Sequence, residues 1–374
     1  VIGYVSLKSR KMAFEDATRL ADAYAREYAN LAQSNFNVDM NMTRALAQVF
    51  EQYYNIPQDQ RIPVYKDILL NVARQNPQFL SVWINWELSA IDSTWELPYG
   101  RGRFTVYREG GRIKYKKEIL NTEGDDVEGA YYKMKVSKQE TVMDPYTFSY
   151  TGREEDEILE TSVCVPILHG NKFMGLAGID LALGRFDEII NKIKPFERSY
   201  AFLIANDGVF VAHPNEEYVG EPISEIKEQE VREFHILKRI QNGLNFSYII
   251  KDKESGVEKY ISYAPIVIGK TSTPWSLGIV VPLEVIMERA MQNFYISLLV
   301  GFIGIIILLF IVYIIAKSIS TPVVKTTQVL KKLAQGDIDK DIKLPVNSQD
   351  EIGQMAQSVN KLIDGLNTTA GFAK

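Results

Sequence analysis

The chain has 374 residues, a formal net charge of −5 and 46% hydrophobic residues, which is ample for two globular modules. The mild acidity gives no basic surface for nucleic acid. The single cysteine, Cys164, excludes an internal disulfide, and the three histidines lie far apart without metal-ligand spacing. We therefore expect no metal and no cofactor.

The N-terminal segment is predicted to be helical. The letters "VIGYVSL" before "KSRK" predict that residues 1–7 end a truncated first transmembrane helix, with an ordinary helix start as the alternative. No Gly or Pro occurs from Tyr4 to Ile56, which predicts one long helix over residues 8–50 or two abutting helices. Apolar residues recur there at spacings of three and four and mark one face, at Phe14, Ala17, Leu20, Tyr24, Tyr28 and Leu31.

Residues 51–185 are predicted to form a first sheet module. After Pro77, segments rich in β-branched and aromatic residues are typical of strands. They are "FLSVWINWE", "RFTVYRE", "RIKYKKEI", "ILETSVCVPIL" and "KFMGLAGIDLAL". The turns "EGG" and "LHGNK" separate some of them, which indicates an antiparallel sheet built from hairpins.

The same pattern returns in residues 186–292. A short amphipathic helix, "FDEIINKIK", precedes strands in "YAFLIANDGVFVAHP", "GLNFSYIIKD", "EKYISYAPIVIG" and "WSLGIVVPLEVIM". The stretches "VPILHGNKFMGLAGIDLAL" and "APIVIGKTSTPWSLGIVVPLEVI" both carry Pro-Ile, a turn, an apolar strand through Gly and a short helix. The repetition predicts one sheet module used twice.

Residues 293–317 are predicted to cross a membrane as one helix. No charged residue occurs from Phe294 to Ala316. At about 1.5 Å per residue such a helix is roughly 35 Å long, enough for a hydrocarbon core of about 30 Å. The basic residues after the span indicate that residues 318–374 are cytoplasmic and residues 8–292 extracytoplasmic. These are Lys317, Lys325, Lys331 and Lys332.

Two stretches with heptad spacing follow the span. The first seam is Ile319, Val323, Thr326, Leu330 and Leu333, and the second is Ile352, Met355, Val359, Leu362, Leu366 and Thr369. Gly336 suits a helix C-terminus, Ile338 and Ile342 give the connector apolar anchors, and Asp350-Glu351 begins the second helix. Two such helices cannot bury both seams alone, so we expect a parallel four-helix bundle across a homodimer.

Two family resemblances account for most of the chain. Pro322, Gly336-Asp337 and Asp350-Glu351-Ile352-Gly353 resemble a HAMP linker over residues 318–370, with a generic juxtamembrane coiled coil as the alternative. The long first helix with "SVWINWELSAID", "YYKMKVSKQETVMDPYTF", "TSVCVPILHGNKFMGLAGIDLAL" and "YAFLIANDGVFVAHPNEEYVGEPI" resembles the double Cache (dCache) sensors of bacterial chemoreceptors and sensor kinases over about residues 10–292. The resemblance implies an α+β fold with two PAS-like modules and a ligand pocket in the membrane-distal one. Residues 371–374 would begin a missing output region.

The resemblance also implies where a ligand binds. In family members that bind free amino acids, an Arg and aromatics precede Pro-Tyr-x-Asp, and a later Asp follows a Gly-hydrophobic step. In this sequence Tyr131 and Tyr132 stand at the aromatic pair, and Pro145-Tyr146 matches the Pro-Tyr step. Phe148 stands where the first Asp is expected, and Asp180 stands at the position of the later Asp.

No Arg precedes the two tyrosines, so the clamp for a ligand carboxylate is missing. An aromatic box with one carboxylate suits an amine or a neutral polar molecule better than an anion. Arg101 and Arg103, expected on a loop, would reverse this preference if they reach the pocket.

Other readings of these residues stay open. Trp83 and Trp86 differ by three positions and face opposite sides of a strand, so at most one lines a pocket. Tyr107 is a further candidate. Asp180 could instead cap the next helix, and the three tyrosines could be ordinary strand residues. The run "REEDEILE" is interpreted as a solvated charge run, and His213-Pro214 as a turn.

We therefore expect a transmembrane receptor, most simply a methyl-accepting chemotaxis receptor, with a sensor histidine kinase as the alternative. Its partners would be a small-molecule ligand, the inner (plasma) membrane, a second copy of the chain and cytoplasmic signalling proteins. A membrane-anchored ectoenzyme is a remote alternative, because neither G-x-S-x-G nor a phosphate-binding loop occurs. A structural or adhesive protein is the third class.

Overall fold

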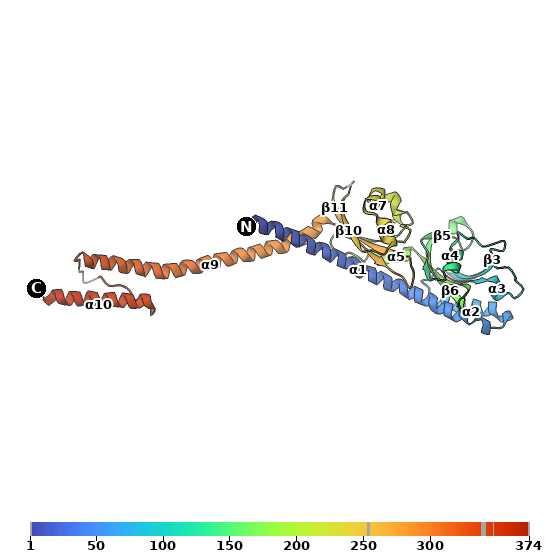
Figure 1. The fold of residues 1–374 in the computed structure, drawn as a ribbon, viewed down its shortest axis with the longest axis horizontal. Helices are drawn as coiled ribbons and strands as arrows, with labels where there is room; N and C mark the ends of the chain where they lie inside the picture. Colours follow the sequence, from blue (N-terminus) through green and yellow to red (C-terminus); the bar gives the residue numbers. More distant parts are fainter. Residues whose placement is uncertain (1, 253–254, 338–341, 347, 373–374) are drawn as a thin grey trace. The chain divides into compact units, whose positions relative to one another are not determined.

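The computed structural model describes residues 2–252, 255–337, 342–346 and 348–372. It divides into two compact units, Val1–Met291 and Gln292–Lys374. Helices and antiparallel sheets alternate through the first unit (Figure 1), which confirms the predicted α+β class. The side chains of residues 1–10 lie outside the described part, so the membrane assignment of residues 1–7 stays a prediction.

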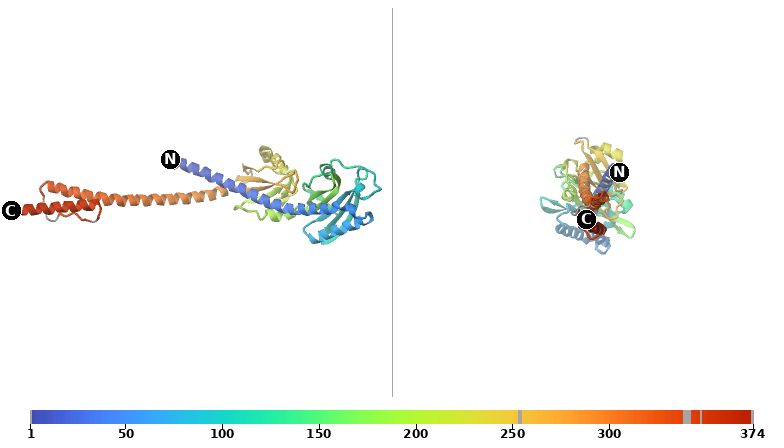
Figure 2. Two further views of the ribbon diagram at one scale, coloured as in Figure 1. Left: turned by 60° about the horizontal axis from the view of Figure 1, so that its bottom comes forward. Right: turned by 90° about the vertical axis from the view of Figure 1, so that its left-hand side faces the viewer.

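Helix α1, Ile2–Glu51, is the long helix that the absence of Gly and Pro predicts, and it runs along both sheets of the first unit (Figures 1 and 2). The predicted apolar face is only partly correct, because Leu20 and Leu31 are 43% and 53% exposed. Ala17, Tyr24 and Tyr28 of the predicted face do pack against the core, and four small side chains next to them let the sheets approach the helix closely. They are Ala21, Ala25, Ala29 and Ala32.

Polar side chains of α1 also hold both sheet modules. Arg44 donates from Nε and Nη2 to the two carboxylate oxygens of Glu140, at 2.6 and 2.7 Å, beside the first sheet. Nearer the N-terminus, Asp22 Oδ1 accepts from the Tyr260 hydroxyl at 2.8 Å in the second sheet. One helix therefore carries contacts to both modules.

The first sheet has the order β3-β2-β1-β7-β6-β4, and β5 also pairs with β6. Every pair is antiparallel, as the predicted hairpins require. Its strands are β1 Ser81–Glu87, β2 Arg101–Glu109, β3 Arg112–Leu120, β4 Thr141–Val142, β5 Tyr146–Phe148, β6 Ile158–His169 and β7 Lys172–Ala182. The added helices are α2 Gln58–Gln75, α3 Leu88–Ile91 and α4 Ala130–Ser137.

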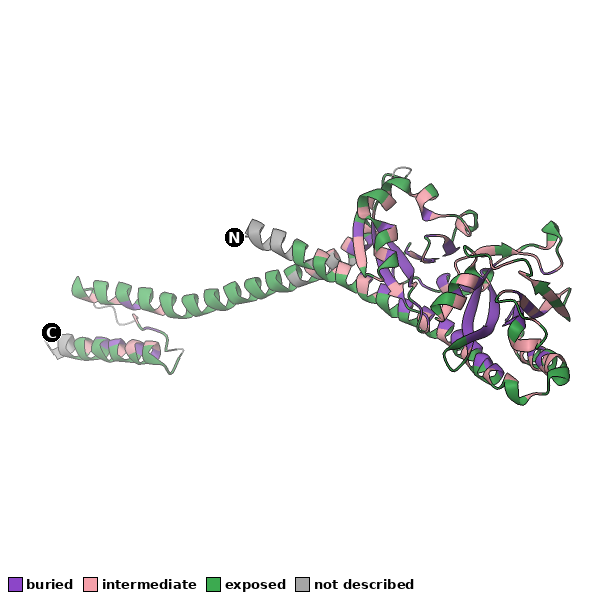
Figure 3. Ribbon diagram, turned by 45° about the vertical axis from the view of Figure 1, so that its right-hand side comes forward, coloured by how far each residue is buried: buried purple, intermediate pink, exposed green. Residues whose placement is uncertain are grey.

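One face of the first sheet packs against α1 and α2 in the main core, where the buried residues gather (Figure 3). Successive strand residues point to opposite faces, so alternate positions of each strand face this core. The other face carries a smaller apolar cluster that includes Trp83, Tyr131 and Cys164. This second face holds the polar residues discussed below.

The second sheet has the order β10-β11-β12-β8-β9 and repeats the arrangement. Its strands are β8 Tyr200–Ile204, β9 Phe210–Ala212, β10 Phe246–Lys251, β11 Glu258–Ile266 and β12 Trp275–Pro282. Helix α5, Gly184–Ile190, precedes it and is shorter than predicted. Three short helices that the sequence reading did not identify follow β9: α6 Ile223–Ile226, α7 Glu228–Phe234 and α8 Ile236–Gln241.

The C-terminal elements are α9, Leu283–Ala334, and α10, Glu351–Phe372. Within the described residues, the Phe294–Ala334 part of α9 is the one helix long and apolar enough to cross a membrane, judged by length and composition. Pro322 lies inside α9, so the helix continues through the predicted boundary at residue 318.

The predicted ends of this helix pair are confirmed. Gly336, just after α9, has a φ of 80°, as a C-terminal glycine requires. Asp350 Oδ1 accepts from the Gly353 backbone N–H at 3.1 Å and caps α10.

Helices α9 and α10 pack through one residue of each predicted seam, Leu333 and Val359, and otherwise through residues outside the seams. The cluster consists of Leu344, Ala356, Val359 and Ile363, with Val329 and Leu333 against it. Leu344 anchors the connector, because its backbone N–H and C=O bond to the Asn360 amide at 2.8 Å each. Of the two predicted anchors, Ile342 is half-buried, while Ile338 lies outside the described residues, as does the side chain of Thr369.

Candidate functional site

The carboxylate of Asp180 lies on the face of the first sheet that points away from α1. Its neighbours in β7, Ile179 and Leu181, alternate into the main core, so the strand period turns Asp180 to the other side. Asp180 is only 3% exposed. It sits within β7, four residues before α5 begins at Gly184, and the helix-cap alternative is therefore wrong.

Four donors surround this carboxylate. Trp83 Nε1 and Ser162 Oγ donate to Oδ1 at 2.7 and 2.6 Å. Ser81 Oγ and the Tyr150 hydroxyl donate to Oδ2, the latter at 2.8 Å. The register explains the gathering, because Ser81 in β1 and Ser162 in β6 are the direct partners of Asp180. Burial raises the pKa of Asp180, and these hydrogen bonds oppose the rise.

A second buried carboxyl, Glu160, shares one of these donors. The Tyr150 hydroxyl lies 2.7 Å from Glu160 Oε2 as well as 2.8 Å from Asp180 Oδ2. A phenol has one proton and can satisfy only one of the two oxygens at a time. Burial, followed by the charge of Asp180, raises the pKa of Glu160 to about 8. Near neutral pH we therefore expect Glu160 to hold a proton.

This pair predicts a stability that falls as the pH rises. The pKa of Glu160 is higher in the folded state, so the folded chain binds more protons between about pH 4.5 and about pH 8. The free energy of unfolding should decrease across that window by an amount of the order of 5 kcal/mol, since one pKa unit is about 1.4 kcal/mol. Urea unfolding at a series of pH values measures this slope.

The matched variants are Glu160→Gln and Glu157→Gln, because Glu157 is exposed near the start of the same strand. Glu160→Gln should remove most of the slope, while Glu157→Gln should keep it. An equal slope in wild type and Glu160→Gln would contradict the assignment to Glu160.

Aromatic side chains wall this carboxylate pair. The rings of Tyr107 and Tyr150 stack with centroids 5.2 Å apart, and Phe148 meets Tyr150 edge-on at 4.9 Å. The Tyr146 hydroxyl lies 2.6 Å from Ser162 Oγ, which itself donates to Asp180. The structure thus places Trp83, Tyr107, Tyr146 and Phe148 near Asp180, and their role in lining a ligand pocket stays a prediction.

The other predicted residues lie elsewhere. Tyr131 and Tyr132 are on helix α4, and not on a strand. Tyr131 is buried and donates to Glu87 Oε1 at 2.7 Å, at the far end of β1, where it shares an apolar cluster with Trp83. Tyr132 is half-buried and makes none of the contacts described for Asp180.

The expectation that Trp86 could bind the ligand is wrong. It faces the main core, is 0% exposed, and stacks on Tyr65 of α2 at 5.4 Å between centroids. Its odd spacing from Trp83 places it on the opposite face from Asp180. Trp83 is therefore the tryptophan of the site, and Trp86 is a core residue.

Arg101 and Arg103 lie on strand β2, and not on the expected loop. They pair with Glu87 and Asn85, and by alternation they share the face of Trp83. Arg103 donates to Glu118 Oε2 at 2.7 and 2.9 Å and lies 5.2 Å from the Phe148 ring centroid. Arg101 lies 4.5 Å from the Tyr131 ring, and its buried Nε has no hydrogen-bond partner within the described chain.

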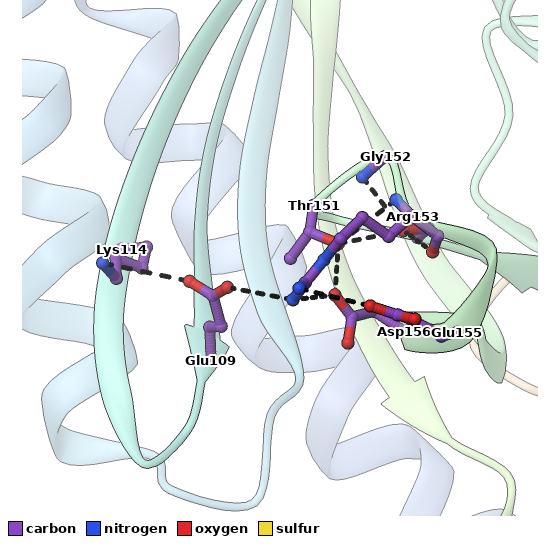
Figure 4. A network of polar contacts seen from close by, with 8 residues as sticks. Glu109, Lys114, Thr151, Gly152, Arg153, Glu155 and Asp156 are labelled. Atoms are coloured by element: carbon purple, nitrogen blue, oxygen red, sulfur yellow. Dashed lines mark hydrogen bonds and ion pairs between the residues drawn. The ribbon is translucent and has the colours of Figure 1, made fainter.

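The loop after β5 closes this face. It carries Tyr150 onto the carboxylates and is fastened by Arg153, which pairs with Asp156, with Glu155 at 3.3 Å and with Glu109 at 3.8 Å (Figure 4). Glu109 ends β2 and also meets Lys114 of β3 at 3.9 Å. The loop that bears Tyr150 is therefore tied to the β2–β3 hairpin across the sheet.

Sequence reasoning missed four members of this cluster: Ser81, Tyr150, Glu160 and Ser162. Glu160 belongs to the run interpreted as solvated, and that interpretation holds for Arg153 to Glu155, which are exposed, but is wrong for Glu160, which is 0% exposed. The period of two in β6 could have identified Glu160 and Ser162 as one face. Tyr150 gave no such signal, because it lies in a loop.

Comparison with known proteins matches both parts of the chain. The sequence profile of the Cache domain covers residues 13–290. The chain belongs to the Cache domain family. A HAMP domain profile covers residues 314–368, beyond the Cache region. The two resemblances on which the sequence reading rested are confirmed.

The similar curated proteins are methyl-accepting chemotaxis proteins. PctB of Pseudomonas aeruginosa is 23% identical over 55% of this chain and 31% of its own length. TlpQ of the same organism is 22% identical over 78% of the chain and 44% of its length, and McpC of Bacillus subtilis is 24% identical over 67% and 35%. The chain thus spans less than half of each of these relatives.

Solved Cache sensor domains share the fold of the first unit. The extracellular domain of the putative histidine kinase mmHK1S-Z3 has a TM-score of 0.60 and 23% identity, over 74% of this chain and 98% of its own. The periplasmic sensory domain of the Campylobacter jejuni chemoreceptor Tlp1 has a TM-score of 0.54 and 14% identity, over 72% and 98%. At these identities the likeness concerns the fold alone.

Proposed function

We propose that this chain is the sensing, membrane-spanning and linker part of a transmembrane receptor. Residues 8–292 lie outside the cytoplasm, residues 293–317 cross the inner membrane, and residues 318–370 form the HAMP linker. The sensor binds a small molecule on the Asp180 face of the first sheet module, which is the membrane-distal one. The chain has no catalytic role of its own in this proposal.

The observation that carries the proposal is the buried pair of carboxyls under a loop. Three of the donors to Asp180 come from strands, and only Tyr150 comes from a loop. Opening that loop would remove one of the two donors to Asp180 Oδ2 and, at the same time, the hydroxyl that lies against Glu160 Oε2. A buried carboxylate that loses its partner is costly, so the open site favours a ligand that restores hydrogen bonds and charge.

An ammonium group answers this requirement, because it can donate to both carboxyls and neutralise one of them. The aromatic wall of Tyr107, Phe148 and Trp83 adds a favourable surface for a cation. We therefore propose an amine as the ligand class. The free Nε of Arg101 supports a variant of this proposal, an amine that also carries an acidic group. A domain of similar fold, from the Pseudomonas fluorescens chemoreceptor CtaA, is solved with L-isoleucine, which supports a small-molecule ligand.

The output is proposed to be chemotaxis, which the methyl-accepting relatives support. A sensor histidine kinase is the alternative, supported by the fold of mmHK1S-Z3. The proposed homodimer rests on the exposed remainder of both seams. These residues, left free by the contact between α9 and α10, are Ile319, Val323, Leu330, Leu362 and Leu366.

A thermal-shift screen of residues 11–291 tests the ligand proposal, because all three apolar clusters of the sensor lie within this range. The library pairs each amine with the amino acid that differs from it by an α-carboxylate. A ligand at 100 times its Kd stabilises the folded state by about 2.7 kcal/mol, which raises the melting temperature measurably.

Asp180→Asn should weaken binding of the hit at least 100-fold, since it removes the charge but keeps the shape. Asp67→Asn, an equal charge change on the exposed side of α2, should leave the affinity unchanged. Binding that survives Asp180→Asn would overturn the site. A library without any hit would favour a structural or adhesive protein.

A further inference from the structure

The second sheet module contains a cavity of its own. Its volume is about 200 Å³, and it opens on the face of the second sheet that points away from α1. Strands β8, β11 and β12 form its floor, and the segment from His213 to Glu230 forms its wall. The floor residues are Tyr200, Phe202, Ile261, Tyr263 and Val280.

This cavity occupies the position that the Asp180 cluster occupies in the first module. A Cβ on Gly178 would lie 2.1 Å from Trp83, and a Cβ on Gly278 would lie 2.1 Å from Phe202. In each sheet, therefore, an aromatic ring packs directly on a glycine of the neighbouring strand. Two residues further along each strand stand Asp180 and Val280. The repeat therefore places a methyl-bearing side chain where the first module has its carboxylate.

The cross-strand partners of Asp180 and Val280 differ in the same way, polar in the first module and apolar in the second. Asp180 pairs across β6 with Ser162, whereas Val280 pairs across β11 with Ile261. The polar floor of the first module is thus apolar in the second. Aromatic rings supply most of the remaining lining, from Tyr200, Phe202, Phe210, Tyr218 and Tyr263.

One polar group of the cavity has an unused hydrogen. Nδ1 of His213 accepts from the Asn215 backbone N–H at 2.9 Å, and the Asn215 carbonyl oxygen lies farther away at 3.3 Å, so we assign the ring proton of the neutral imidazole to Nε2. Burial lowers the pKa of His213 to about 4, which keeps the ring neutral at physiological pH. No acceptor for Nε2 occurs in the part of the chain that the structure describes. His213 directly follows β9 and lines the cavity.

The charges at the rim satisfy one another. Lys259 pairs with Asp252, and Lys227 lies 3.9 Å from Glu230, which also accepts from the Tyr248 hydroxyl at 3.1 Å. Two cations and two anions leave no net charge to hold an ionic ligand. The rim therefore favours an uncharged molecule, in contrast with the buried carboxyls of the first module.

We infer that this cavity is a second ligand site, which takes a small, uncharged, planar aromatic or heteroaromatic molecule with a hydrogen-bond acceptor. The rings of Phe202, Phe210 and Tyr218 contact its faces and edges, and His213 Nε2–H donates to its acceptor. The volume limits it to one or two fused rings, since pockets for drug-sized ligands are about 300–1,000 Å³. The inference is independent of what binds at Asp180.

Two probes that differ at one ring position test this. Benzimidazole has an acceptor nitrogen where indole has a C–H, and both are neutral at pH 7.5. Binding to the whole 374-residue chain in lipid nanodiscs is measured by saturation-transfer NMR and calorimetry. Benzimidazole should bind, and indole should bind about tenfold more weakly, because one hydrogen bond to His213 is lost.

Variants locate the binding. His213→Phe should reduce benzimidazole affinity about tenfold and abolish the preference over indole, and Val280→Phe, which fills the floor, should abolish binding of both probes. Asp180→Asn should leave both affinities unchanged, so failure here is distinguishable from failure at the first module. Absence of benzimidazole binding, or binding that neither His213→Phe nor Val280→Phe alters, would overturn the inference. Circular dichroism melts confirm that each variant is folded, and Val280→Phe remains informative if His213→Phe is not.

Discussion

Gly178→Ala is expected to lower the free energy of unfolding of the sensor by about 3 kcal/mol, the upper part of the range for overpacked cores. The new Cβ would lie 2.1, 2.3 and 2.5 Å from three atoms of the Trp83 indole. The ring cannot withdraw freely, because its Nε1 donates to Asp180 at 2.7 Å. Relief of the clash therefore breaks this bond, and ligand affinity at Asp180 should fall together with stability.

Urea unfolding of residues 11–291 measures the loss. Gly184→Ala is the matched control, because the nearest atom to its Cβ is Asp187 Oδ2 at 3.9 Å and the residue opens helix α5. That substitution should be neutral or slightly stabilising. In a Trp83→Leu background, Gly178→Ala should cost much less. Equal stability of wild type and Gly178→Ala would show that the ring does not lie on this glycine.

Leu330→Asp is expected to abolish ligand-dependent output while leaving ligand affinity unchanged. Leu330 is 42% exposed in the single chain and belongs to the part of the first seam that α10 does not cover. In the proposed four-helix bundle this position is buried against the second copy, where a carboxylate would be desolvated without a partner. The sensor lies in a separate compact unit, so its site should be unaffected.

The output is measured in a receptor that carries this chain joined to a cytoplasmic signalling domain, and the affinity on residues 11–291. Gln328→Asp introduces the same charge two positions away, on an exposed face outside the heptad seam, and should signal normally. Normal signalling by Leu330→Asp would remove the support for a functional HAMP bundle.

The strands of both sheets could be predicted from sequence, because buried strands such as "SVWINWE" and "KFMGLAGIDLA" are dense in apolar and β-branched residues between turns. The contact face of α1 was harder to predict. Large residues such as Leu20 and Leu31 dominate a periodicity argument, yet they are exposed, and much of the N-terminal contact is made by alanines, which a hydrophobicity pattern ranks lower. Close approach of a helix to two sheets selects for small volume, and composition alone does not reveal that.

In the candidate site, too, some residues could be identified from the sequence and others could not. Asp180 and Tyr146 could be proposed from a motif, but Glu160 and Ser162 depend on which residues of β6 face β7, and this needs the register. Tyr150 depends on the path of a loop. Arg101 and Arg103 are expected on a loop from the sequence, whereas the sheet extends β2 through both. The sequence can therefore identify single candidate residues, but which of them lie together around Asp180 depends on how the strands pair.

Helix α1 has a mechanical consequence. The helix has no Gly or Pro from Tyr4 onward and is stiff along its axis, and at about 1.5 Å per residue its 50 residues form a rod of roughly 75 Å. Such a rod cannot absorb a movement by shortening. If the first sheet tilts against its Arg44 contact, the rod must roll or slide at the far Asp22–Tyr260 contact. A sub-ångström displacement of the first sheet near Asp180 would then change the angle between α1 and the second sheet. The size of that change would depend on the distances of the Arg44 and Asp22 contacts from the point about which the helix turns.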